Sequence, residues 1–72
     1  MNQVGRKIKE LRESQGMTQI DLAHLAGVHN SLISKIESGH TVGSLQTLQK
    51  LASALVVPVS VLVSEGDSQS DM

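Results

Sequence analysis

The sequence predicts an all-α fold, a compact domain of five short helices, from three observations. Apolar residues recur three or four positions apart along most of the chain, which is the spacing of one helix face. Glycines and helix-capping residues separate these apolar sets. The chain has 72 residues and no cysteine, so we expect one domain without disulfides. Because Phe, Tyr and Trp are absent, its core must consist of aliphatic and methionine side chains.

The first helix is predicted over residues 3–15. Val4, Ile8 and Leu11 are spaced i, i+4 and i+7, so they share one face of such a helix. Gly16 follows, and glycine readily adopts the left-handed conformation in which helices often end.

The second helix is predicted to begin at Thr18. Asp21 lies three residues further on, which is the spacing of a capping box, in which each side chain bonds the backbone N–H of the other residue. Gly27 ends this helix. Its expected buried side consists of Leu22, Ala23, Leu25 and Ala26.

Two further helices follow from the same signals. The third is predicted over residues 30–38 and ends at Gly39. Its apolar side chains are Leu32, Ile33 and Ile36. After a loop at 40–43, Ser44 caps the fourth helix. The expected apolar face of the fourth helix consists of Leu45, Leu48, Leu51, Ala52 and Leu55.

The last apolar segment, residues 56–63, fits two structures. Alternation of β-branched residues is typical of a strand. Such valines occupy alternate positions here, namely Val57, Val59, Val61 and Val63. Pro58, however, suits the first turn of a helix, and residues 60–63 can form a short fifth helix.

The charged residues are unevenly distributed along the chain. Six Lys and Arg face seven Asp and Glu, a formal net charge of −1. Three of the acidic residues and none of the basic ones lie in the polar segment 64–72, SEGDSQSDM, which we predict to be a disordered acidic tail. Residues 1–63, the predicted globular domain, then carry six basic and four acidic residues, a net charge of +2. This mild positive charge is compatible with a nucleic-acid partner.

Composition argues against several classes of protein. No apolar run approaches the ~20 residues of a membrane span and no signal-peptide pattern is present, so we expect a cytoplasmic protein with no membrane partner. His24, His29 and His40 lack the spacing and the cysteine partners of a zinc site. We expect no metal, no cofactor and no enzymatic activity, because no spacing marks a catalytic nucleophile.

Four motifs match a known family. Residues 17–28, MTQIDLAHLAGV, match T-Q-x-x-L-A-x-x-A-G-V, and residues 33–39, ISKIESG, match I-S-x-I-E-x-G. SLQTL at 44–48 and LASAL at 51–55 follow in the expected order. Over residues 5–63 the sequence resembles the phage repressor and Cro-type helix-turn-helix family, the XRE-like transcriptional regulators. The resemblance implies that the second and third helices form the helix-turn-helix.

The resemblance also implies that the third helix reads base edges in the major groove of DNA. Its apolar residues must face the core, so helical spacing leaves a polar outer face. Asn can form two hydrogen bonds with adenine, Lys can reach guanine, and Ser adapts to either. The candidate base-reading residues are Asn30, Ser31, Ser34 and Lys35. Asn30 can also cap the helix, and Lys35 can equally be an ordinary solvated charge.

Other candidates would contact the DNA backbone. Gln19 begins the second helix, where its amide and the free backbone N–H groups form an anion site, and the resemblance implies a phosphate contact there. Thr18 would mainly cap this helix, with an added phosphate contact. His29 stands where the family more often has Ser or Thr, and it caps the third helix, touches a phosphate or does neither. The candidates beside the following loop are Ser38, His40 and Thr41.

Arg12 and Glu37 are assigned a structural role by the resemblance. They match positions that form a partly buried ion pair in related repressors. Such a pair would tie the first helix to the end of the third, and we expect its loss to destabilise the fold.

The resemblance further implies a homodimer on double-stranded operator DNA. One helix that reads about four bases cannot identify a unique genomic site, and relatives bind as dimers to half-sites ~34 Å apart. Apolar residues near the end of the chain are the expected dimer surface, although Val57, Val59 and Leu62 alternatively close the core. The dimer candidates are Val56, Val59, Val61, Leu62 and Val63.

The end of the chain also matches the family. Residues 54–63 resemble the pattern A-L-G-V-P-V-S-x-L-L, whose last part is a short helix, and this favours the helix for the final segment. Val56 replaces the usual glycine, and a β-branched residue resists a left-handed turn there. Some related antitoxins end instead in a strand that pairs with the dimer mate.

The hypothesis is a sequence-specific transcriptional regulator of the repressor type. The alternative is an antitoxin that binds a toxin protein and autoregulates its operon. A third possibility is a fold retained without DNA binding.

Overall fold

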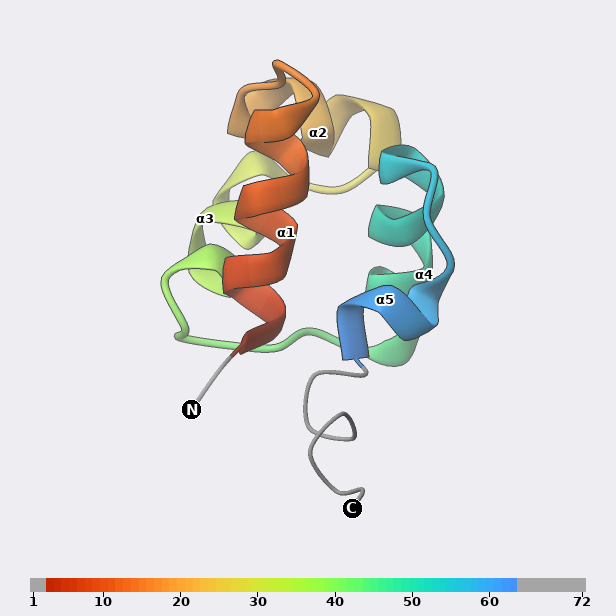
Figure 1. Cartoon of the computed structure of the whole chain (residues 1–72). Coiled ribbons are helices and arrows are strands. Elements are labelled where there is room, and N and C mark those ends of the chain that lie inside the picture. Colours follow the sequence, from red (N-terminus) through yellow and green to blue (C-terminus); the bar gives the residue numbers. More distant parts are fainter. Residues whose placement is uncertain (1–2, 64–72) are drawn as a thin grey trace.

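The chain folds into five helices that surround one core (Figure 1). A computed structural model describes residues 3–63; the acidic tail predicted at 64–72 lies outside the described residues. The helices are α1 (Gln3–Ser14), α2 (Gln19–Ala26), α3 (Asn30–Glu37), α4 (Leu45–Leu55) and α5 (Val59–Val63). In Figure 1, α1 crosses the front, with α2 above it, α3 on the left and α4 on the right. The predicted all-α, five-helix fold is confirmed, and no strand occurs in residues 3–63.

The start of α2 is fixed by the predicted capping box. The backbone N–H of Asp21 donates to Thr18 Oγ1 at 3.0 Å, and the backbone N–H of Thr18 donates to Asp21 Oδ2 at 2.9 Å. This second bond, from the Thr18 backbone, is the main reason that the pKa of Asp21 lies below its ordinary value. Gly27 ends the helix with a left-handed φ of 71°.

The starts of α3 and α4 differ in how they are capped. His29 occupies the capping position of α3, but its side chain makes no capping hydrogen bond. Asn30 is already the first helical residue, so the alternative in which Asn30 caps α3 is wrong. Ser44 caps α4 as predicted, because its Oγ accepts the backbone N–H of Thr47 at 3.1 Å.

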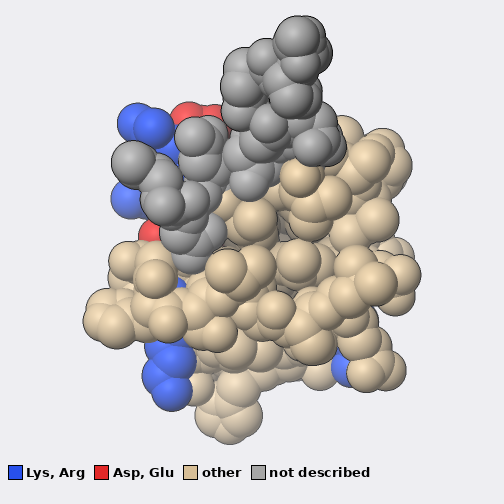
Figure 2. All heavy atoms as spheres, turned by 90° about the horizontal axis from the view of Figure 1, so that it is seen from below, with Lys and Arg blue, Asp and Glu red and all other residues tan. Residues whose placement is uncertain are grey.

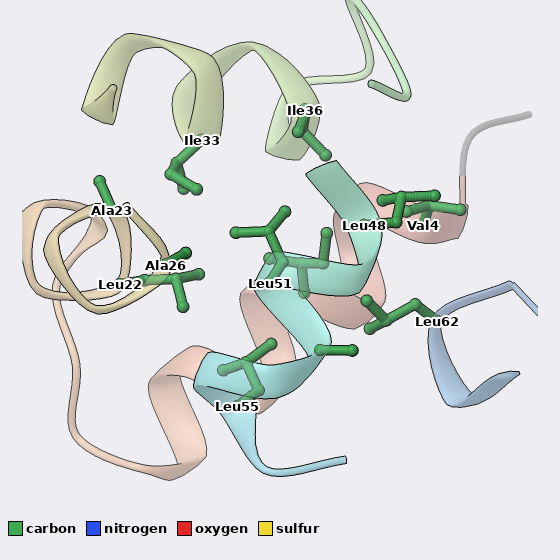
Figure 3. Close-up of a cluster of buried hydrophobic side chains, with 12 residues drawn as sticks. Val4, Leu22, Ala23, Ala26, Ile33, Ile36, Leu48, Leu51, Leu55 and Leu62 are labelled. Carbon is green, nitrogen blue, oxygen red and sulfur yellow. The ribbon is translucent and has the colours of Figure 1, made fainter. Parts of the chain in front are cut away.

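All five helices contribute aliphatic side chains to the core (Figure 3). The side chains exposed by 1% or less include Ile8, Leu22, Ile33, Ile36, Leu51, Leu55 and Leu62. Full burial of one such side chain stabilises the fold by about 1.5–3 kcal/mol, so these residues supply much of the driving force for folding.

Two leucines expected in the core are on the surface instead. Leu25 is 63% exposed, because the buried arc of α2 is centred on Ala26 and Leu25 lies about 100° around the helix from it. Leu45 is 62% exposed, because it is the first residue of α4 and the buried face of that helix begins one turn later, at Leu48.

The final segment forms a helix, α5, so the strand alternative for residues 56–63 is wrong. Leu62 points from α5 into the core (Figure 3). The turn before α5 requires Val56 to adopt φ 60° and ψ 45°, although β-branching was expected to resist this conformation. The turn is held by hydrogen bonds from the backbone N–H groups of Val56 and Val57 to carbonyls near the end of α4. Val56 is thus a strained residue that the surrounding turn keeps in place.

Gly5 allows α1 to lie against the end of α3. A Cβ atom at this position would stand 2.0 Å from the carbonyl oxygen of Ile36, and 3.0 Å from the Cα of Glu37. Both are backbone atoms, which cannot rotate away as a side chain would. The contact between the two helices therefore depends on a residue without a side chain.

We expect Val56→Gly to stabilise the free chain. A left-handed conformation costs an L-residue about 1–2 kcal/mol, and the greater unfolded-state entropy of glycine offsets part of that gain. The free energy of unfolding should rise by about 1 kcal/mol in urea titrations at low protein concentration. Glycine at Ser53, inside α4, should have the opposite effect. A loss of stability in Val56→Gly would contradict strain at this turn.

We expect Gly5→Ala to destabilise the fold by about 1–3 kcal/mol, because the new methyl group must push α1 away from α3. Thermal unfolding measured by circular dichroism gives the difference. Arg6→Ala is the control, since Arg6 is the neighbouring, exposed residue and its loss should change stability by less than about 0.5 kcal/mol. Equal melting temperatures for Gly5→Ala and the wild type would refute the close approach.

Candidate nucleic-acid interface

The predicted ion pair between Arg12 and Glu37 is present and buried. Arg12 Nε lies 2.7 Å from Glu37 Oε2, and Arg12 Nη2 lies 3.0 Å from Glu37 Oε1, so the contact is bidentate. The side chains are 9% and 4% exposed. Hydrogen bonding to Glu37 raises the pKa of Arg12 above its ordinary value despite the opposing effect of burial.

The ion pair extends into a network that joins three helices. Arg12 Nη1 donates to the backbone carbonyl of Met17 at 2.8 Å, which fixes the loop between α1 and α2. Gln19 Nε2 donates to Glu37 Oε1 at 3.0 Å, which links the start of α2 to the end of α3. The network therefore sets how α2 and α3 lie relative to α1.

The bond between Gln19 and Glu37 was not anticipated from the sequence. The two residues are 18 positions apart, and no helical spacing rule connects them. Only the resemblance offered a signal, because it placed Gln19 at the start of α2 and Glu37 near the end of the facing helix.

The four base-reading candidates share the outer face of α3. Ile33 and Ile36 are buried and Leu32 is half-buried, so the apolar side of the helix faces the core as expected. The exposed residues on the other side include Asn30, Ser31, Ser34 and Lys35. Side chains of these types form hydrogen bonds with base edges, and the structure leaves them accessible.

The candidates at the start of α2 are partly engaged within the protein. Gln19 is half-buried and donates one amide hydrogen to Glu37. A primary amide carries two donor hydrogens, so one remains for an external acceptor such as a phosphate. The Thr18 hydroxyl oxygen accepts the backbone N–H of Asp21, which makes capping its main role.

The candidates around the α3–α4 loop make local hydrogen bonds within the protein. Ser38 Oγ donates to the carbonyl of Lys35 at 3.1 Å and lies 2.6 Å from His40 Nδ1. Thr41 Oγ1 accepts the backbone N–H of Gly43 at 3.3 Å. The structure thus places Ser38, His40 and Thr41 together beside the end of α3. His29 lies at the opposite end of that helix.

The chain offers few cations to a nucleic acid. On the face drawn in Figure 2, most of the described surface is neither acidic nor basic, and the basic side chains lie at its edges. The whole chain has six Lys and Arg residues, and Arg12 is buried in its pair with Glu37. Any attraction to DNA must therefore come from a small number of cations.

The structure divides the dimer candidates into three groups by exposure. Val56 is 85% exposed and Val63 is 41% exposed, whereas Val59 and Val61 are half-buried. Leu62 is fully buried within its own chain, so its inclusion in a dimer surface was wrong. Its side chain closes the core instead, together with the half-buried Val57 and Val59.

The described residues contain no cluster of three or more His, Cys, Asp or Glu side chains able to hold a metal ion. No helix among residues 3–63 is long and apolar enough to cross a membrane.

The sequence matches a known family and is similar to several known proteins. A model of the helix-turn-helix family matches residues 8–62. The immunity repressor protein of Bacillus phage phi105 is 39% identical over 62 residues, which cover 86% of this chain and 43% of the repressor. The putative antitoxin HigA2 of Mycobacterium tuberculosis is 41% identical over 63 residues, or 85% of this chain and 61% of the antitoxin. This chain thus spans roughly half the length of these relatives.

A solved structure is also similar to this chain. The chain superimposes on the biofilm master regulator SinR, determined in complex with DNA, with a TM-score of 0.79 and 36% sequence identity. The match covers 83% of this chain and 97% of that chain.

We expect Glu37→Ala to lower the free energy of unfolding by about 3–5 kcal/mol, because it removes the carboxylate that compensates the charge of the buried Arg12 guanidinium. Lys35→Ala, on the exposed face of the same helix, should change stability by less than about 0.5 kcal/mol. Chemical denaturation of both variants makes the comparison, and equal stability would rule out the structural role.

Proposed function

Because the chain belongs to the helix-turn-helix family, we propose that it is a sequence-specific transcriptional regulator, a repressor, that binds operator DNA as a homodimer. One observation carries the proposal: the polar outer face of α3 is exposed while the buried Arg12–Glu37 network holds α3 against α1 and α2. SinR, which shares this fold, was determined in complex with DNA. A regulator of this kind acts where the chromosome lies, so we assign it to the cytoplasm.

We propose that α3 enters the major groove and reads base edges near its first turns. Asn30, the first helical residue, can form two hydrogen bonds with adenine because its amide is not used as a cap. Lys35 can reach a guanine, and the two serines at 31 and 34 adapt to either base. These side chains would determine the operator sequence.

Contacts with the DNA backbone would position this helix. We assign Gln19 to a phosphate through its second amide hydrogen, with Thr18 beside it at the start of α2. The remaining backbone candidates are His29, Ser38, His40 and Thr41. Most of these groups are neutral, so affinity should fall less steeply with salt than it does for strongly basic repressors.

A homodimer would place two copies of α3 on half-sites about 34 Å apart. We propose that residues 1–63 form the DNA-binding domain and that its last part supplies the dimer surface. The dimer candidates that keep apolar surface available to a partner are Val56, Val59, Val61 and Val63. Residues 64–72, which follow in the sequence, carry three acidic residues.

A second function is favoured by one relative. The putative antitoxin HigA2 is 41% identical to this chain. An antitoxin would bind a toxin protein and regulate its own operon through the same α3. Co-purification of a second chain encoded beside the gene would favour this function over a repressor that acts alone. The three relatives described above are named as a repressor, an antitoxin and a regulator, and we propose no catalytic activity or cofactor for this chain.

We expect Asn30→Ala and Lys35→Ala to weaken operator binding by about 1–3 kcal/mol each and to relax the preference at one base position. Footprinting on the DNA upstream of the gene would locate the operator, and mobility shifts with single-base changes would measure the preference. Lys50→Ala, which removes an exposed charge from α4, is the matched control and should leave the preference unchanged. If wild-type protein showed no salt-sensitive binding to duplex DNA, the proposed function would be wrong.

A further inference from the structure

A hollow lies on the surface where α1, α2 and α3 meet. Its floor contains the buried pair of Arg12 and Glu37. Gln19, Ser34 and Lys9 stand around it, one from each helix, with Ser38 one turn beyond Ser34. The hollow therefore adjoins both the start of α2 and the outer face of α3.

The two charges on the floor neutralise each other. Arg12 uses Nε and Nη2 on Glu37 and Nη1 on the carbonyl of Met17, so three of its five N–H donors are bonded within the protein. Glu37 in turn accepts from both Arg12 and Gln19. A ligand that enters the hollow would meet a nearly neutral floor. The residues on the rim would therefore determine whether the hollow favours an anion or a cation.

Lys9 is the cation on that rim. It is exposed, and within residues 3–63 it forms no ion pair with a carboxylate, in contrast to Arg6, which lies 4.0 Å from Glu10. A lysine ammonium offers three donors on a flexible stem and binds phosphate as a point charge. Glu13, also on the rim and 58% exposed, opposes an anion but is itself 3.8 Å from Arg12.

The side of α1 that carries Lys9 is the side that faces the proposed interface. Lys9 shares the hollow with Gln19, assigned above to a phosphate, and with Ser34, assigned to a base. Lys7 lies two residues earlier, about 200° around α1, and points away from the hollow. The two lysines thus have the same charge on the same helix but opposite positions relative to α3.

We propose that Lys9 binds a phosphate of the DNA backbone in this hollow, so that α1 contributes directly to the interface alongside α2 and α3. The inference rests on the proposed DNA-binding function and adds a cationic contact to an interface whose other backbone candidates are mostly neutral. Such a contact would position the protein without reading sequence, because every nucleotide carries the same phosphate.

The test compares Lys9→Gln with Lys7→Gln, two substitutions that change the net charge equally. Dissociation constants are measured from about 50 to 200 mM salt on the footprinted operator and on an unrelated duplex. Lys9→Gln should weaken binding to both duplexes by a similar factor, and its loss of affinity over this salt range should be about threefold smaller than in the wild type. Lys7→Gln should match the wild-type salt dependence.

A third variant tests the charge balance of the rim. Glu13→Gln should strengthen binding to both duplexes, because it removes the carboxylate that opposes a phosphate in the hollow. Unchanged melting temperatures would show that all three variants are folded. If Lys9→Gln bound with wild-type affinity and salt dependence, this inference alone would be overturned. The same would follow if Lys7→Gln changed the affinity and salt dependence as much as Lys9→Gln does. A wild-type chain that binds neither duplex would overturn the proposed function as well.

Discussion

The bidentate contact between Arg12 and Glu37 is the constraint on which the arrangement of this protein depends. Its two charges are buried beside a core of aliphatic side chains, which impose less directional constraint on the helices than hydrogen-bonded groups do. A buried ion pair stabilises a fold little compared with well-packed apolar residues, yet leaving one partner alone is costly. Its main effect is therefore to specify one geometry, in which α1, α2 and α3 meet at a fixed point.

The same carboxylate connects the core with the candidate interface. Both carboxylate oxygens of Glu37 accept from Arg12, and Oε1 also accepts from the amide of Gln19. The start of α2 is thus oriented by a group that also maintains the fold. In a chain this short, few residues are available for separate structural and binding roles, and a shared acceptor allows one side chain to serve both.

Much of the fold could be predicted because its signals are local. Thr18 with Asp21 and Ser44 mark helix starts, Gly27 marks an end, and these groups act within three or four residues of one another. Exposure was harder to predict. The apolar spacing of Leu25 and Leu45 fits a buried face, but burial depends on where neighbouring helices lie. The candidate site was predicted in its residue types through the resemblance, whereas the bond from Gln19 to Glu37 depends on tertiary geometry.

At position 56, the residue that best stabilises the free chain can differ from the residue that best stabilises an assembled dimer. Its left-handed backbone costs the isolated fold about 1–2 kcal/mol, and its 85% exposed side chain gains nothing there in return. Burial of a valine against a partner is worth about 1.5–3 kcal/mol, which is enough to offset that strain. In the proposed dimer, burial of Val56 would offset the backbone strain in each monomer, so folding would be coupled to association. The position would then be under selection for the stability of the pair and not of the single chain.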